Sequence, residues 1–253
     1  MKAIIQNHLK QIEQAEDVKI LLAVESGSRA WGFPSPDSDY DVRFIYVRTN
    51  EFYLKLEKTS DVIEYMLDEE LDINGWDLKK ALCLLKKSNP TLFEWIASPI
   101  VYYEAPVFER IRNIAAHCFL SRPALYHYLN MARNNNREFL RRDRVRLKKY
   151  FYVLRPILAC KWILARQTPP PMLFAELVEA ELGREVRSIV DGLLERKAVT
   201  SELGEQEPIA ALNGYIEKEL SAIEEAVGHA PKQDAVPWEQ LNRLFLSFLR
   251  DYE

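Results

Sequence analysis

Residues 26–47, which read SGSRAWGFPSPDSDYDVRFIYV, constrain the fold of this chain more than any other stretch. An apolar run of strand length at residues 20–24 precedes the stretch, and a β-favouring run at residues 42–47 ends it. Between the two runs lie a glycine-bearing turn and two aspartates separated by one residue. We therefore predict a strand, a turn with a short helical segment at 27–31, an exposed Pro-Ser-Pro loop and a second strand.

The two aspartates are Asp39 and Asp41, and with Arg43 they occupy alternate positions. On a strand such residues share one face, so the two carboxylates would lie side by side and repel each other. Mg²⁺ takes oxygen ligands and keeps waters for substrate phosphates, which makes it a fitting counter-ion. Gly27 and Ser28 offer backbone N–H groups and a hydroxyl to a phosphate. The pattern favours phosphoryl or nucleotidyl transfer over a merely polar turn, in which Asp and Ser are also common.

The Gly-Ser pair, the ten-residue spacer and the Asp-x-Asp pair resemble the signature of the DNA polymerase β-type nucleotidyltransferase superfamily. The longer string GSRAWGFPSPDSDYDVRFIY is similar to the RlaP family of predicted nucleotidyltransferases from bacteria and phages. Similar segments follow at residues 70–82, 89–102 and 148–156, so the resemblance covers most of the chain.

This resemblance implies a Mg²⁺-dependent enzyme, with Mn²⁺ as a possible substitute, that transfers NMP from an NTP to an acceptor hydroxyl and releases pyrophosphate. The RlaP resemblance implies an RNA-repair setting with an RNA or tRNA end as acceptor. A protein hydroxyl and a small molecule such as an antibiotic are alternative acceptors. A non-catalytic nucleotide- or RNA-binding module on the same fold is the alternative from another class.

A site with two metal ions needs a third carboxylate, which the superfamily places on a neighbouring strand between apolar residues. Asp72, between Leu71 and Ile73, fits that pattern better than Glu64 or Glu70. A solvent-facing residue at a strand end is the alternative reading. In the expected mechanism Asp39 and Asp41 hold both ions, while Asp72 joins one of them and helps to deprotonate the acceptor hydroxyl.

Basic and aromatic residues supply further candidates for nucleotide binding. We expect Ser28 to donate to a triphosphate oxygen and Arg29 to hold the phosphates. Arg43 would neutralise the carboxylates or contact the pyrophosphate; surface ion pairs are the alternative for both arginines. The family resemblance adds Lys149, Tyr150 and Arg155 to the nucleotide-binding candidates.

A run of cations in the second half recurs at helical spacing: Arg133, Arg137, Arg141, Arg144 and Lys148. If one helix carries them, they form a basic stripe suited to an RNA backbone or a triphosphate, with Tyr150 or Tyr152 available for base stacking. A solvated helix face is the alternative, because most charge runs are solvated.

The spacing of apolar residues divides the chain near residue 105. Before it we expect helices at 3–15, 50–57, 78–87 and 91–97, and strands at 20–24, 42–47, 62–67, 70–74 and 100–103. After it no strand is expected, and helices are expected at 106–118, 122–140, 143–167, 171–182, 185–196, 207–227 and 237–250. The expected fold class is α+β, with a DNA polymerase β-like domain containing a mixed sheet at 1–105 and an all-helical domain at 106–253.

The composition of the chain argues against several classes of protein. A net charge of −4 argues against a protein that coats nucleic acid over its whole surface. The three cysteines are odd in number and widely spaced, which indicates reduced thiols in a cytoplasmic protein. The chain shows no signal-peptide pattern, no apolar segment of membrane-spanning length and no P-loop motif.

Overall fold

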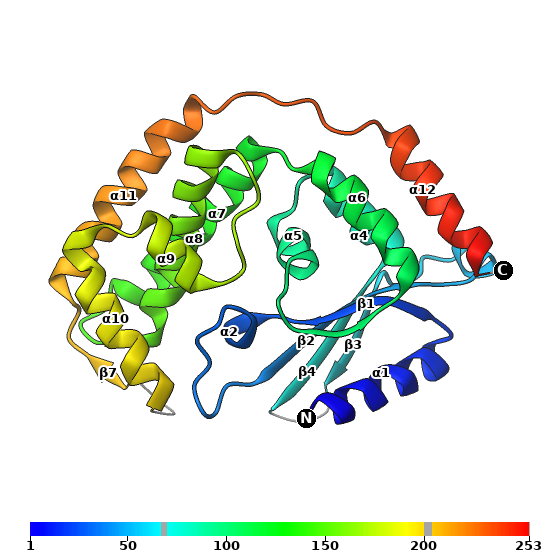
Figure 1. The fold of residues 1–253 in the computed structure, drawn as a ribbon, viewed down its shortest axis with the longest axis horizontal. Helices are drawn as coiled ribbons and strands as arrows, with labels where there is room; N and C mark the ends of the chain where they lie inside the picture. The colour runs from blue at the N-terminus through cyan, green and yellow to red at the C-terminus, as the bar shows by residue number, and fades with distance from the viewer. Residues whose placement is uncertain (67–69, 200–203, 253) are drawn as a thin grey trace. The chain divides into compact units, whose positions relative to one another are not determined.

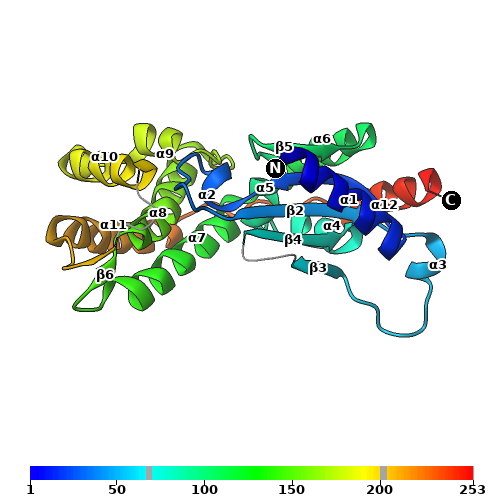
Figure 2. The same ribbon diagram turned by 90° about the horizontal axis from the view of Figure 1, so that it is seen from below.

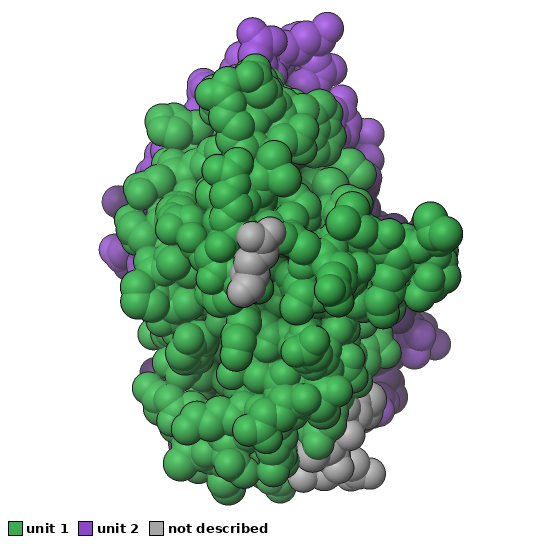
Figure 3. All heavy atoms as spheres, turned by 90° about the vertical axis from the view of Figure 1, so that its right-hand side faces the viewer, with its two compact units in different colours: residues 1–30, 39–119, 235–253 green, residues 31–38, 120–234 purple. Residues whose placement is uncertain are grey.

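The computed structural model of the chain describes residues 1–66, 70–199 and 204–252. These residues fall into two compact units, which Figure 3 shows in different colours. Unit 1 comprises residues 1–30, 39–119 and 235–253, and unit 2 comprises residues 31–38 and 120–234.

Unit 1 is built on a five-stranded sheet with the order β3-β4-β2-β1-β5 (Figures 1 and 2). Its strands are β1 (Lys19–Glu25), β2 (Tyr40–Val47), β3 (Val62–Met66), β4 (Leu71–Asp77) and β5 (Val101–Glu104). The sheet is mixed, because β2 and β4 run parallel while the other neighbours are antiparallel. Strand β1 lies near the middle, and its apolar residues are buried on both faces, as its continuous apolar run predicts.

Helix α1 (Lys2–Glu16) lies on one face of this sheet. Its buried residues Ile5, Leu9 and Ile12 recur at helical spacing and join a core with Phe44 and Ile73 from β2 and β4. Alternate residues on these strands point to the opposite face, which therefore carries the side chains of positions 41, 43 and 72.

The opposite face is covered in part by α5 (Pro90–Ile96), whose Trp95 ring stacks on Trp76 of β4 with 3.9 Å between centroids. Asp77 is the N-cap of helix α4 (Leu78–Lys86), and its carboxylate accepts the Lys79 N–H at 2.7 Å. Unit 1 also contains α2 (Gly27–Ala30), α3 (Asn50–Tyr53), α6 (Glu109–Cys118) and α12 (Trp238–Asp251), and α12 packs on α4.

Unit 2 is a helical assembly around α8 (Lys148–Arg166), which is buried along most of its length. Around α8 pack α7 (Ser121–Asn135), α9 (Phe174–Glu181) and α11 (Ala210–Gly228). Helix α10 (Arg184–Val199) packs on α11. Phe33, from the loop before β2, fills this core against Phe151 and Phe174, with ring centroids 5.1 and 5.2 Å away.

The α+β class and the mixed sheet followed by a largely helical region are confirmed. Three expectations about the second half are wrong. The helix expected at 143–167 begins only at Lys148, and the α-helical part of the segment 122–140 ends at Asn135 and continues as a π-helical turn, Asn136–Leu140. Two short strands, β6 (Val145–Arg146) and β7 (Glu205–Gln206), pair where no strand was expected.

The division into domains at residues 1–105 and 106–253 stays a prediction, because a compact unit is a group of residues in mutual contact and need not coincide with a domain. The units do show that α6 and α12 belong with the sheet and that the loop at 31–38 belongs with the helices. Residue 67 of the strand expected at 62–67 lies outside the described residues. Among the helices that the structure describes, none is both long enough and apolar enough to cross a membrane.

Candidate functional site

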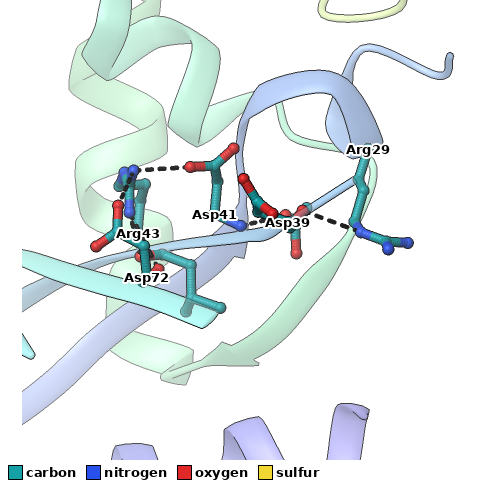
Figure 4. Close-up of polar contacts among 7 residues, drawn as sticks. Arg29, Asp39, Asp41, Arg43 and Asp72 are labelled. Atoms are coloured by element: carbon teal, nitrogen blue, oxygen red, sulfur yellow. Dashed lines mark hydrogen bonds and ion pairs between the residues drawn. The ribbon is translucent and has the colours of Figure 1, made fainter. Parts of the chain in front are cut away.

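The candidate site is formed where β2 and β4 run side by side. Their parallel pairing places Asp41 directly opposite Asp72. The Arg43 Nη2 atom donates to Asp41 Oδ1 at 3.0 Å and to Asp72 Oδ2 at 2.7 Å, so one guanidinium lies between two carboxylates (Figure 4). Asp72 therefore lies on a neighbouring strand beside Asp41, as the sequence reading expected of a third carboxylate.

Asp39 lies one residue before the start of β2. Its backbone carbonyl accepts a hydrogen bond from Arg29 Nε at 3.1 Å, and the Arg29 guanidinium lies 3.7 Å from the centroid of the Tyr40 ring. In this arrangement Arg29 supports the chain that carries Asp39 (Figure 4).

Burial and the neighbouring charges together determine the pKa of the Asp41 carboxyl. Partial burial raises the pKa of the Asp41 carboxyl, the Arg43 guanidinium opposes that rise, and the charges of Asp72 and Asp39 add to it. The three carboxylates therefore act on one another, and a bound cation would relieve their repulsion.

Gly27 is required by the backbone and by the site. Its φ of +60° is a conformation that side-chain-bearing residues rarely adopt, and a Cβ placed there would lie 2.0 Å from Asp41 Oδ2. The adjoining Ser26 N–H donates to the Asp41 carbonyl at 2.8 Å, which fixes the turn against β2. Ser28 follows in α2 and is half-buried. The Gly-Ser turn and the aspartate strand are thus in direct contact, although thirteen residues lie between Gly27 and Asp41 in the sequence.

Glu25 is a site residue that the sequence reading missed. It is fully buried, and its Oε1 accepts the backbone N–H of Asp41 at 2.7 Å while its Oε2 accepts the hydroxyl of Tyr102. Burial raises the pKa of the Glu25 carboxyl. The available signal was a carboxylate that ends an otherwise apolar run, at residues 20–25, immediately before the Gly-Ser turn.

The chemistry of these side chains fits a hard divalent cation, since carboxylate oxygens are the ligands that Mg²⁺ prefers. In the described residues, however, no three acidic, histidine or cysteine side chains are gathered closely enough to hold a metal ion as they stand. The guanidinium of Arg43 lies between the two nearest carboxylates. A cation that used these same two oxygens, Asp41 Oδ1 and Asp72 Oδ2, would have to displace Arg43.

The expected basic stripe does not exist as one helix face, because residues 141–147 are not α-helical. Acidic or polar groups contact several of its members: Arg133 pairs with Glu224, Arg141 pairs with Glu217 at 2.9 Å, Arg137 donates to Asn134 at 3.1 Å, and Arg144 donates to the Glu205 carbonyl at 2.7 Å. The stripe geometry is wrong, and a role of these residues toward RNA stays a prediction.

The three family-based candidates on α8 lie in unit 2. Tyr150 is fully buried and its hydroxyl bonds to Asn213 and to the Ile209 N–H, so its ring is not placed to stack on a base. Arg155 is buried, with its guanidinium 4.7 Å from the centroid of the Trp31 ring. Lys149 lies on the ring of Phe139. Nucleotide binding by Lys149, Tyr150 and Arg155 stays a prediction.

This chain is similar to a known relative, to a solved structure and to a protein family. A relative from Bacillus subtilis (strain 168), named "Uncharacterized protein YcgL", is 47% identical over 253 residues, which cover 99% of this chain and 97% of that protein. A solved structure of a nucleotidyltransferase-like protein from Exiguobacterium sibiricum 255-15 aligns with a TM-score of 0.33 and 12% identity, over 98% of this chain and 80% of that one. The model of the RlaP family, described as an RNA repair pathway DNA polymerase beta family, matches residues 1–247. The chain therefore belongs to the RlaP family.

Proposed function

We propose that this protein is a nucleotidyltransferase that moves NMP from an NTP to an acceptor hydroxyl, with RNA as the acceptor. The observation that carries the proposal is the convergence of Asp41 and Asp72 from two parallel strands on one cation, the Arg43 guanidinium. The description of the family as an RNA repair family supports RNA as the acceptor class.

Asp39, Asp41 and Asp72 would hold Mg²⁺, or Mn²⁺ in its place, as two ions. When bound, such ions neutralise phosphate charge and lower the pKa of the attacking hydroxyl. The carboxylates themselves are suited to this task because Asp41 and Asp72 are partly exposed, with side-chain accessibilities of 35% and 42%.

In the proposed reaction the acceptor oxygen attacks the α-phosphorus of the NTP. A P–O bond to the acceptor forms, the bond between the α-phosphorus and the bridging oxygen breaks, and pyrophosphate leaves. Asp72 takes the hydroxyl proton. Arg43, once released from the carboxylates, offers a paired set of N–H donors to the leaving pyrophosphate, and Ser28 and Arg29 orient the triphosphate.

Glu25 supports this reaction indirectly, through the backbone of Asp41. By accepting the Asp41 N–H it fixes the start of β2, so that the carboxylates of residues 39 and 41 have a defined direction. Its side chain has no exposure to solvent, so it acts as a positioning residue.

The test uses each of the four NTPs, labelled either at the α- or at the γ-phosphate, with Mg²⁺ or Mn²⁺ and pooled RNA. We expect the α-label to enter the RNA and the γ-label to leave as pyrophosphate. Transfer of the γ-label would indicate a kinase, and label in the protein itself would indicate a protein acceptor; either result contradicts the proposal.

The position of Arg43 also fits a second candidate, a non-catalytic module in which the guanidinium neutralises the carboxylates permanently. In that case Mg²⁺ has no measurable affinity for the protein and no NTP is consumed. Calorimetric titration with Mg²⁺ in the presence of a non-hydrolysable NTP separates the two candidates.

A further inference from the structure

A cavity of about 310 Å³ lies wholly within unit 2 and is unusually basic. In the part of the chain that the structure describes, it is lined by four cationic side chains, one carboxylate and one aromatic ring: Arg142, Arg144, Arg146, Lys149, Glu205 and Phe139. Ligand pockets for small organic molecules are mostly apolar, so this lining indicates an anion.

The short sheet of unit 2 holds the cations in place. Val145 and Leu147 are buried, whereas Arg144 and Arg146, which alternate with them along the chain, are exposed. Arg144 donates to the Glu205 carbonyl at 2.7 Å, and Arg146 pairs with the Glu205 carboxylate at 3.3 Å. The guanidinium groups are thereby anchored without being fully neutralised.

Lys149 shows that positive charge is concentrated here. Its ammonium lies 3.8 Å from the centroid of the Phe139 ring. Partial burial lowers the pKa of Lys149 and the nearby charge of Lys148 lowers it further; the Glu138 carboxylate opposes both, and the charge of Arg146 adds a smaller lowering effect. A bound anion would remove this repulsion among cations.

A second cavity of about 500 Å³ in the same unit provides a contrast. Its lining includes Arg133, Arg137 and Arg141, but Glu224 and Glu217 lie in the same wall and pair with two of these arginines. Exposed pairs of this kind leave little net charge to attract an anion. The excess of positive charge therefore lies at the first cavity.

We propose that the cavity lined by Arg142, Arg144, Arg146 and Lys149 binds phosphates of the RNA backbone. The proposal rests on the proposed function, and it assigns to the RNA acceptor a binding site of its own in unit 2. Arginine side chains recognise phosphate oxygens with paired N–H donors. Arg144 immediately precedes β6 and Arg146 ends it, so the two guanidinium groups are offered to different phosphates of one RNA strand.

The test measures binding of a fluorescent single-stranded RNA by anisotropy, in EDTA and without NTP. In the double variant Arg144→Ala/Arg146→Ala we expect at least a roughly tenfold loss of affinity. The slope of log affinity against log salt should become shallower by about 1.4, because each phosphate contact on a single strand contributes about 0.7. The comparison variant, Arg137→Ala/Arg141→Ala, removes the same charge from the second cavity; the present proposal predicts a change of less than about twofold, whereas RNA binding by the stripe expected from the sequence predicts a loss as large as in the first variant.

Glu205→Gln should change the affinity for RNA in the opposite direction. It removes the one carboxylate among the described residues of the lining, so RNA should bind about threefold more tightly. Arg142→Glu covers the case in which the double variant fails to fold, since Arg142 is exposed and lies outside both strands of the short sheet. Equal losses in the first and the comparison variant, or no effect of Arg142→Glu and Glu205→Gln, would overturn the proposal.

Two further comparisons complete the test. One distinguishes RNA from a free anion as the bound phosphate, and the other distinguishes this inference from the proposed function. Inorganic phosphate or ATP that displaces RNA at micromolar concentration would assign the cavity to a free anion and overturn the RNA assignment. RNA binding is measured without metal and NTP, so it does not depend on catalysis. If the double variant binds RNA like the parent and still transfers NMP, only this inference is wrong. If RNA binding depends on the cavity but the protein transfers no NMP, only the proposed catalytic function is wrong.

Discussion

Gly27→Ala tests whether the Gly-Ser turn and the aspartate strand form one site. The substitution adds a Cβ at a position with φ of +60°, where it would lie 2.0 Å from Asp41 Oδ2. Ordinary contacts begin near 3.4 Å, so the carboxylate must retreat by the difference, about 1.4 Å. That retreat also disturbs the 3.0 Å hydrogen bond from Arg43 Nη2 to the other oxygen of this carboxylate, Asp41 Oδ1.

Two effects of different size are expected. The left-handed backbone alone costs an alanine roughly 1–2 kcal/mol, so the free energy of unfolding should fall by about that amount. The displaced carboxylate affects activity far more, because a misplacement of about 1 Å in a catalytic group can reduce the rate about a hundredfold. Denaturant unfolding measures the first effect, and initial rates of NMP transfer measure the second.

Gly204→Ala is the matched control. Gly204 also has positive φ, at +65°, but among the described atoms nothing lies within 4 Å of the added Cβ. It should lose similar stability with little loss of activity. If Gly27→Ala keeps parent-like transfer, or loses no more activity than Gly204→Ala, the close contact between Gly27 and Asp41 is not part of the site.

Three other substitutions test separate parts of the account. Arg43→Ala removes the cation between Asp41 and Asp72, so the variant should be less stable without metal and gain more thermal stability from added Mg²⁺ than the parent; an equal Mg²⁺-induced shift in Tm would contradict this. Asp72→Ala should lower turnover by several orders of magnitude while metal-dependent NTP binding is retained, and an inactive Glu64→Ala variant with active Asp72→Ala would show that the third carboxylate is misassigned. Burial raises the pKa of Asp77, so its contribution to stability is fully present below pH 3.8 and is lost as the pH rises through the folded-state pKa. Asp77→Asn keeps the helix cap, so between pH 4 and pH 7 its free energy of unfolding should fall less than that of the parent in denaturant titrations. An unchanged pH dependence would show that Asp77 is not the group responsible.

The central motif was predictable because its signals are local. The apolar run before Gly27 and the β-favouring run after Asp41 identify two neighbouring strands without any knowledge of the fold. Asp72 needed the family resemblance as well, since its pairing with Asp41 joins strands about thirty residues apart in sequence.

Contacts between distant residues explain what the sequence did not reveal. Glu25 has its role because Asp41 and Tyr102 converge on it, 16 and 77 residues away. The loss of helix between Leu140 and Lys148 is also tertiary, since residues 145–146 pair with residues 205–206 instead of continuing a helix. Charge spacing alone fits a helix equally well, so the basic stripe was a reasonable but wrong reading of the segment.

Domain boundaries were hard to read for a related reason. The loop at 31–38 packs Phe33 into the helical core, and α12 returns to α4 after more than a hundred residues of unit 2. Neither connection leaves a periodic pattern in the sequence, because each depends on which apolar surface is left uncovered elsewhere.

Transfer of α-labelled NMP to RNA by Asp39→Asn and Asp41→Asn, each compared with the parent, tests the central claim most directly. Asparagine keeps the shape of the side chain and removes the charge that a divalent cation requires. Both variants should unfold cooperatively like the parent and show no transfer with Mg²⁺ or Mn²⁺. Parent-like transfer by either folded variant would contradict the assignment of this site to nucleotidyl transfer.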